Sequence, residues 1–344
     1  MNLNHVRYKF LRSVRYCYLV LFLTLSWSIS AHGFDKVVIW GHKLHSHTHS
    51  YIHERFYRAF DYLGCPVHWF DNNDNVQDFD FSDSLFITEG QVDALMPIRN
   101  DCKYILHNCN LDKYRGVKES NCLIMQVYNN RLPFRDDLIK VDTCMYYDVP
   151  NRTVYMPWAA DMLPHEIEEM KAKIGEFEKD ACVHWIGTLG GGVYGNINEL
   201  LPFSDACVEN GISFLHTGNP WVKGLSREDC NNIIARSYFF PAIVGTWQVE
   251  NGYIPCRIFI AICLGQMGIT NAKSVYELFD GNVVYNENTH QLFYDALERA
   301  KTWTLQDQLA LMDFVKEKHT YLNRIKLLLD FFELMQSKGS SKED

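Results

Sequence analysis

A histidine-rich loop follows the first strongly apolar segment of the chain. Residues 41–50 read GHKLHSHTHS, directly after KVVIW, which we predict to be a buried strand. Ligands of α/β proteins bind at loops that follow the carboxyl ends of parallel strands, and an imidazole can serve as a general base at neutral pH. We therefore predict that His45 and His47 are catalytic. A metal site is one alternative, although no nearby acidic residue completes a recognisable signature, and a solvated polar loop is the other.

A glycine-rich loop and a lysine are suited to bind phosphate. Residues 187–196, GTLGGGVYGN, follow a predicted strand, and Gly190, Gly191 and Gly192 let backbone N–H groups approach a phosphate closely. The spacing fits neither a dinucleotide-binding nor a Walker motif, and a flexible turn between domains is the alternative. Lys223 follows another predicted strand, from where its ammonium group could reach a phosphate.

A polar stretch before an apolar helix carries the remaining candidates. Residues 247–271 read WQVENGYIPCRIFIAICLGQMGITN, and Pro255 suits a first helical turn. Arg257 then lies near a helix N-terminus, where the unpaired N–H groups and the dipole favour an anion, so we predict a diphosphate clamp. Glu250 is suited to hold ribose or sugar hydroxyls. The alternatives are a surface arginine beside a buried helix and a salt-bridged structural glutamate.

Length and charge limit the classes of protein to consider. The chain has 344 residues, more than the roughly 250 to 300 at which single cores stop growing, so two domains are predicted. An aromatic content of 14% argues against disorder. The net charge of −9 gives no support to nucleic-acid binding, which favours a basic face.

The N-terminus has the pattern of a targeting segment. Basic residues precede an apolar run of about 12 to 15 residues, and small residues follow it, as in a signal peptide. The run is short for a spanning helix of about 20 residues. We predict that residues 1–33 are a signal peptide or a signal anchor that associates with a membrane. The expected location is a Golgi-type secretory lumen or membrane, or secretion, and the cytoplasmic face of a membrane is the alternative.

The eleven cysteines show no CxxC pair, so no zinc framework is predicted. The disulfide state of the ten cysteines beyond the leader stays open.

Strand and helix patterns alternate along the rest of the chain, which predicts an α/β fold with parallel sheets. We predict about six strands in the first half, a short helix over 91–99, a linker over 150–164 and one long helix over 305–335. The predicted domains are 34–160 and 161–304, two similar α/β domains with a cleft between them, followed by a helix over 305–336 and a polar tail over 337–344.

With these residues placed, the chain resembles a GT-B glycosyltransferase of a family-1-like, uncharacterised subgroup. The resemblance rests on VHWIGTLGGGVYGN, VENGYIPCRIFIAICLGQMGITN and VYELFDGNVVYNEN, and covers roughly residues 181–300. It implies that both domains are Rossmann-like and face each other across the cleft, and that the helix over 305–336 packs back on the first domain. It also implies that Glu250, Asn251, Tyr253 and Arg257 line the donor site, with the three central glycines of the loop near the phosphates. The retaining signature of two glutamates eight positions apart is not matched, because Ile258 stands at the second position.

The implied activity is hexosyl transfer from a nucleotide diphosphate-sugar to a glycan, protein or lipid hydroxyl, with no nucleic-acid partner. Arg257, Lys223 and the glycine loop would stabilise the leaving diphosphate without an obligatory metal or other cofactor. A two-domain nucleotide-sugar epimerase and a periplasmic-type sugar-binding receptor without catalysis are the alternatives. The donor sugar, its base, the acceptor and the stereochemistry stay open.

Overall fold

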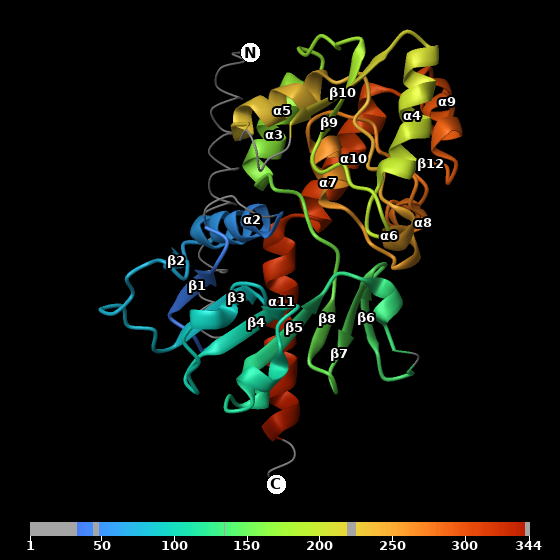
Figure 1. Cartoon of the computed structure of the whole chain (residues 1–344). Coiled ribbons are helices and arrows are strands. Elements are labelled where there is room, and N and C mark those ends of the chain that lie inside the picture. Colours follow the sequence, from blue (N-terminus) through green and yellow to red (C-terminus); the bar gives the residue numbers. More distant parts are fainter. Residues whose placement is uncertain (1–32, 44–47, 134, 219–224, 341–344) are drawn as a thin grey trace, which may run out of the picture. The chain divides into compact units, whose positions relative to one another are not determined.

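The computed structural model describes residues 33–43, 48–133, 135–218 and 225–340. These residues form two compact units (Figure 1): the first contains the described residues up to Leu123, except Thr48, and those from Phe332 onward, and the second contains Thr48 and Ile124–Phe331. The predicted leader over 1–33 lies, apart from Gly33, outside the described residues. Within the described part of the chain, no helix is both long and apolar enough to cross a membrane.

A parallel sheet forms the centre of the first unit. Its strands follow the order β2-β1-β3-β4, and the next strand in that order, β5, begins in this unit. The bounds are β1 Lys36–Trp40, β2 Val67–Phe70, β3 Ser84–Glu89, β4 Lys103–His107 and β5 Cys122–Gln126. Because β1 and β3 are buried almost throughout, they read as continuous apolar runs, as strands covered on both faces do.

Helix α2, Thr48–Tyr62, connects β1 to β2 and buries one face. Ile52, Phe56 and Phe60 recur at helical spacing and are at most 3% exposed. The other core of this unit is aromatic: the rings of Phe86 and Tyr104 stack with centroids 5.2 Å apart. The short turns η1 Asp93–Leu95, η2 Leu111–Tyr114 and η3 Glu119–Asn121 join the later strands.

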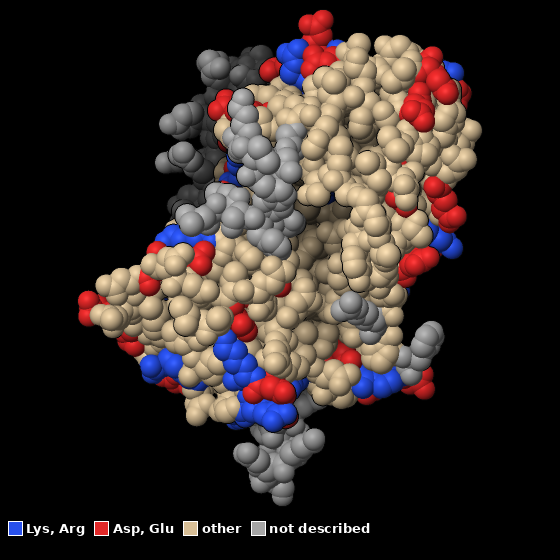
Figure 2. All heavy atoms as spheres, viewed as in Figure 1, with Lys and Arg blue, Asp and Glu red and all other residues tan. Residues whose placement is uncertain are grey.

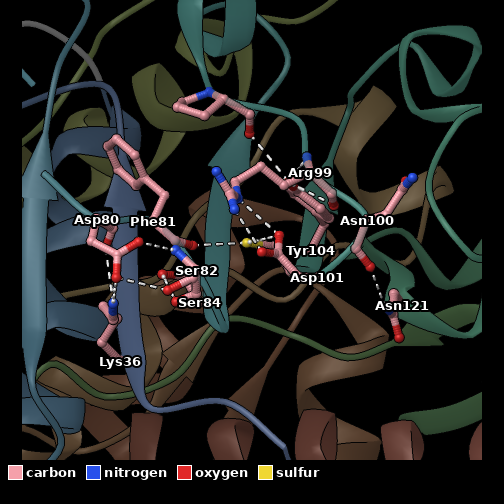
Figure 3. Close-up of polar contacts among 12 residues, drawn as sticks. Lys36, Asp80, Phe81, Ser82, Ser84, Arg99, Asn100, Asp101, Tyr104 and Asn121 are labelled. Atoms are coloured by element: carbon pink, nitrogen blue, oxygen red, sulfur yellow. Dashed lines mark hydrogen bonds and ion pairs between the residues drawn. The ribbon is translucent and has the colours of Figure 1, made fainter. Parts of the chain in front are cut away.

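Polar side chains form a network at the amino ends of β1, β3 and β4 (Figure 3). Arg99 donates to both carboxylate oxygens of Asp101 at 2.8 and 2.6 Å. Lys36 donates to the Asp80 carbonyl at 2.8 Å, and the Tyr104 hydroxyl accepts from the Arg99 N–H at 2.7 Å. These bonds satisfy polar groups at the edge of the sheet where the strands begin.

The second unit begins with the order β5-β8-β7-β6. Strand β8, Thr153–Tyr155, pairs with β5 in parallel, whereas β7, Met145–Asp148, is antiparallel to both β8 and β6, Ile139–Asp142. The turn η4, Asn129–Arg131, follows β5. Two parallel pairs come later: β9 Cys182–Ile186 with β10 Ser213–Gly218, and β11 Ile269–Thr270 with β12 Val284–Tyr285.

All but the last of the helices that follow pack around these later strands, as Figure 1 shows. Their bounds are α3 Pro164–Lys173, α4 Ile197–Glu209, α5 Arg227–Arg236, α6 Thr246–Glu250, α7 Cys256–Cys263, α8 Lys273–Leu278, α9 Thr289–Ala300, α10 Leu305–Lys318 and α11 Tyr321–Ser340. Helix α7 is apolar enough to be a core element, since Ile258, Phe259 and Ile262 are all fully buried. The last helix, α11, lies beside β7, where the Tyr147 hydroxyl donates to the Leu327 carbonyl at 2.9 Å. Phe332, in α11, groups with the first unit, where Lys103 Nζ lies 5.9 Å from its ring centroid.

Four sequence predictions need correction. The predicted helix over 91–99 is only the short turn η1, and β6 and β8 were not predicted. Strand β8 lies inside the proline-containing stretch 150–164 that was interpreted as a linker. The predicted helix over 305–335 is broken at residues 319–320, because the Thr320 N–H and hydroxyl both donate to Asn323 Oδ1, at 2.9 and 2.7 Å, and so start a new helix.

Candidate functional site

A cluster of histidines and one glutamate occupies the carboxyl ends of the strands in the first unit. His42 follows β1, Glu89 ends β3 and His107 ends β4, and each of them is at most 6% exposed. His42 Nε2 and Glu89 Oε2 are 3.1 Å apart. From the first turn of α2, the half-buried His49 ring stacks on His42 with centroids 5.6 Å apart and lies 5.3 Å from His107. Parallel strands thus bring together residues that are far apart in sequence.

The protonation of the cluster follows from burial and hydrogen bonds. Burial lowers the pKa of His53 to about 4, even though its Nδ1 hydrogen-bonds to the Gly41 carbonyl at 2.8 Å. Burial alone would raise the pKa of Glu89. The hydrogen bonds from His42 and the Gln91 N–H outweigh that effect and leave the pKa below its usual range. Glu89 is therefore ionised at neutral pH beside a neutral His53.

Glu89 is the residue that sequence reasoning missed. The acidic partner that the histidine loop lacks in its own neighbourhood comes from β3, 47 positions after His42. The only signal for it was the strand pattern SLFITE, which ends on a charged residue at the same sheet edge. The predicted bases His45 and His47 lie outside the described residues.

A second group of candidates surrounds Arg257 in the first turn of α7. Its Nη2 donates to the Ile186 carbonyl, at the carboxyl end of β9. The guanidinium lies 3.7 Å from the ring centroid of Trp185 and 4.9 Å from that of Phe240. Burial lowers the pKa of Arg257 to about 10, so it remains charged at neutral pH. Nη1 is buried and has no hydrogen-bond partner in the described part of the chain.

The glycine loop begins beside this arginine. Gly187 has φ +134°, and a Cβ there would lie 2.8 Å from Arg257 Nη2, so only glycine fits without displacing the guanidinium. The Gly190 carbonyl accepts from the N–H groups of Asn196 and Ile197 at 2.9 and 3.0 Å, and thereby caps the start of α4. Gly191 and Gly192 are exposed.

Two glycines allow the loop to pack closely. A Cβ on Gly195 would lie 2.1 Å from the Gly190 oxygen, and one on Gly245 would lie 1.8 Å from the Gly195 oxygen. The backbone of the loop therefore touches both itself and the residue that precedes α6. The predicted phosphate loop is a compact turn held against α4 and α6.

The other predicted donor residues lie at the end of α6 and just after it. Glu250 is exposed, whereas Asn251 is engaged: its amide donates to the Trp247 carbonyl at 2.7 Å and its Oδ1 accepts from Asn130 at 2.8 Å. Tyr253 is half-buried. Asn251 thus ties α6 to η4. Lys223 lies outside the described residues.

Aromatic rings connect these elements. Trp247 contacts Tyr194 of the glycine loop, with centroids 4.9 Å apart, and Tyr128, with centroids 5.2 Å apart. Tyr128 in turn lies 5.6 Å from Tyr253. Tyr194 is 74% exposed. The second unit therefore brings the glycine loop, the end of α6 and Arg257 into one region, which contains an exposed ring that the sequence prediction did not include.

Comparison with known proteins gives a result at the level of fold. No family model and no curated protein matches the sequence. Among solved structures, an α-glucosyltransferase in complex with UDP and a 13-mer DNA containing a HMU base is similar, with a TM-score of 0.53 and 11% identity, over 88% of this chain and all of that one. A similarity to an α1,3-fucosyltransferase, with 12% identity over 88% of this chain and 90% of the other, has a TM-score of 0.45, too low to carry an argument. The chain therefore has the α/β fold of the GT-B glycosyltransferases that its sequence resembles.

Proposed function

We propose that the chain is a glycosyltransferase that moves a sugar from a nucleotide diphosphate-sugar to an acceptor hydroxyl. The observation that carries the proposal is Arg257 Nη1, a buried cationic donor without a partner in the described residues, at the carboxyl end of β9. Leaving such a group unsatisfied costs about 1 to 3 kcal/mol, which a diphosphate oxygen would recover. The fold shared with an α-glucosyltransferase that was solved with UDP supports this assignment.

In the proposed reaction, the acceptor oxygen bonds to the anomeric carbon while the bond from that carbon to the phosphate oxygen breaks. Arg257, Lys223 and the N–H groups of Gly191 and Gly192 stabilise the charge on the departing diphosphate, with no metal required there. The acceptor proton passes to a histidine of the loop over 41–50, for which His45 and His47 stay our candidates.

The sugar and the base of the donor have candidate partners near α6. Exposed Glu250 is suited to accept hydrogen bonds from sugar hydroxyls. Tyr194, exposed beside Trp247, offers a ring face for a base or a sugar. Because the side chain of Asn251 is held by Trp247 and Asn130, we propose that it positions α6.

We also propose a domain organisation and a cellular location for the chain. We assign the acceptor to residues 34–160 and the donor to 161–304, although close contacts group 124–160 with the later residues. We also propose that residues 1–33 direct the chain into a secretory lumen or attach it to a membrane.

The proposed acceptor is a glycan, protein or lipid. On the face shown in Figure 2, the Lys and Arg side chains of the described residues are interspersed with Asp and Glu. The net charge of −9 is a further reason to favour an acceptor other than nucleic acid. Because the similar α-glucosyltransferase was solved with DNA, a screen of acceptors for this chain should include a DNA oligonucleotide.

The test measures thermal unfolding of the full-length protein with UDP, GDP and their sugars. We expect one nucleotide diphosphate to raise the unfolding temperature, because ligands that bind only the folded state stabilise it. Arg257→Met should weaken the binding of that nucleotide about tenfold or more. The matched control is Arg236→Met, which removes an exposed arginine that is paired with Asp180 at 2.8 Å at the opposite end of β9.

Three outcomes would change the proposal. An unchanged nucleotide affinity in Arg257→Met would remove this residue from the site. Conversion of a nucleotide-sugar to its epimer would favour the epimerase alternative. Binding of free sugars, with no response to any nucleotide and no transfer or hydrolysis, would favour a sugar receptor.

A further inference from the structure

Three metal-binding side chains converge at the carboxyl edge of the sheet in the first unit. His42, His49 and Glu89 each offer one ligand atom, and these atoms all lie within 4.8 Å of one another. They come from three segments, namely the end of β1, the first turn of α2 and the end of β3. We propose that these three residues form a binding site for one divalent transition-metal ion of the zinc class.

The separations suit such an ion. Bonds of about 2.1 Å in a tetrahedral site place ligand atoms roughly 3.4 Å apart. His42 Nε2 and Glu89 Oε2 already stand 3.1 Å apart. The other separations within the group are at most 4.8 Å, within about 1.4 Å of the tetrahedral value. Two imidazoles and one carboxylate favour Zn²⁺, Co²⁺ or Fe²⁺ over Mg²⁺ and Ca²⁺, which prefer oxygen ligands.

Hydrogen bonds around the three residues fix their orientation. The Gln91 N–H donates to Glu89 Oε2 at 3.0 Å. His53 Nδ1 bonds the carbonyl of Gly41, the residue before His42, at 2.8 Å. Such outer contacts orient ligands in known metal sites. His42 also has φ +58°, a strained conformation for a residue with a Cβ, and strain of this kind persists where surrounding contacts enforce it.

A second histidine–glutamate pair in the chain serves as a comparison for the three proposed ligands. His290 Nε2 and Glu209 Oε2 are also 3.1 Å apart, but both side chains are at least 40% exposed. Among the residues the structure describes, that pair has no third ligand within reach, since the one such group is His42, His49 and Glu89. A buried carboxylate with two imidazoles gains more from a bound cation than an exposed ion pair does, because water does not screen the interaction.

The proposed ion joins the two ends of the loop that carries His45 and His47, because His42 and His49 stand on either side of them in the sequence. It lies in the first unit, and the diphosphate assigned to Arg257 needs no metal. The proposal does not rest on the transferase assignment, since the test reads metal binding directly.

The test uses the full-length protein after treatment with a chelator. Co²⁺ is titrated while visible absorption is followed, and Zn²⁺ is titrated by calorimetry. We expect one equivalent of each, with the d–d bands of a cobalt ion bound by nitrogen and oxygen. Glu89→Gln and His49→Ala should each weaken binding about 100-fold or more, since even outer-shell changes cost 10 to 100-fold. His290→Ala should leave the affinity unchanged.

Failure of the wild-type protein to bind either ion would overturn the proposal. Equal affinities in wild type, Glu89→Gln and His49→Ala would overturn it as well. Circular dichroism without metal checks that each variant is folded. If Glu89→Gln does not fold, the test rests on His49→Ala, which should fold because the His49 side chain is only half-buried.

Discussion

The two ends of the parallel strands carry charge in different ways. At the amino ends, Arg99 pairs with Asp101 at 2.6 Å in the first unit, and Arg236 pairs with Asp180 at 2.8 Å in the second. All four of these side chains are at least 34% exposed. At the carboxyl ends, Glu89 is 2% exposed, and the Nη1 atom of Arg257 is buried. Both units show the same contrast.

The exposed pairs at the amino ends and the buried charged groups at the carboxyl ends have different roles in the protein. Exposed ion pairs contribute about 0 to 1 kcal/mol and join residues that local chain geometry already holds. Buried charge costs free energy unless partners satisfy it, and proteins accept such costs at functional sites. The carboxyl ends, where α/β proteins bind ligands, are therefore the place to look for function in both units.

The largest expected effect is at Arg257. Arg257→Ala removes the hydrogen bond to Ile186 and the stacking on Trp185, and should lower the free energy of unfolding by about 3 kcal/mol. Urea denaturation measures this loss. The matched control is Arg236→Ala, for which we expect a much smaller loss because its ion pair is exposed to water. Equal losses in the two variants would break the contrast in the second unit.

The next effect concerns the first unit. Glu89→Ala leaves His42 Nε2 and the Gln91 N–H without their acceptor, and should cost about 2 kcal/mol of unfolding free energy. The measurement is made with a chelator present, so that loss of a bound ion does not contribute. A loss no greater than that of Asp101→Ala would show that burial of the pair has no energetic consequence.

A buried histidine away from the strand ends gives a third test. His319 accepts from Arg324 Nη2 at 3.1 Å, and burial, with the charge of Arg324, holds its pKa well below the usual range. Above pH ~6.5 the imidazole of His319 is neutral in both the folded and the unfolded state. Below it the unfolded state binds the extra proton, so stability should fall by up to about 1.4 kcal/mol per pH unit.

His319→Asn retains an acceptor near Nδ1 and cannot take up the proton. Unfolding measured from pH 7 to 5 should therefore show a smaller slope in this variant. A slope identical to that of the wild type would assign the pH dependence to other groups, among them His53 of the cluster, whose pKa is also lowered.

The smallest effects are expected at the amino ends. Arg99→Ala and Asp180→Ala should each change the free energy of unfolding only slightly, because water competes for these exposed groups. Losses above about 2 kcal/mol in either variant would remove the energetic difference between the two ends.

Short-range pattern predicted more of the fold than of the site. The apolar run KVVIW gave the bounds of β1 correctly, since buried parallel strands leave a continuous signal. Strand β8 was missed because prolines near it favoured a linker. The break before α11 was missed because Thr320 and Asn323 cap a helix inside an uninterrupted apolar pattern.

The site was harder to predict because its contacts are long-range. Glu89 reaches His42 only through the pairing of β1 with β3, which no local pattern reveals. Arg257 was identified from its place near a helix start. Its stacking on Trp185 depends on α7 packing beside β9, 71 residues earlier in the chain.

The close approach of Gly195 and Gly245 has a consequence for tracing the ancestry of this protein. A side chain at Gly245 would collide with the Gly195 carbonyl oxygen, only 1.8 Å from its Cβ. A side chain at Gly195 would instead collide with the Gly190 oxygen, 2.1 Å from its Cβ, so each position is restricted by the backbone of the loop. In distant relatives, where overall identity falls to the level of unrelated sequences, both glycines should persist wherever the loop keeps this packing, and they would mark descent that pairwise alignment does not detect.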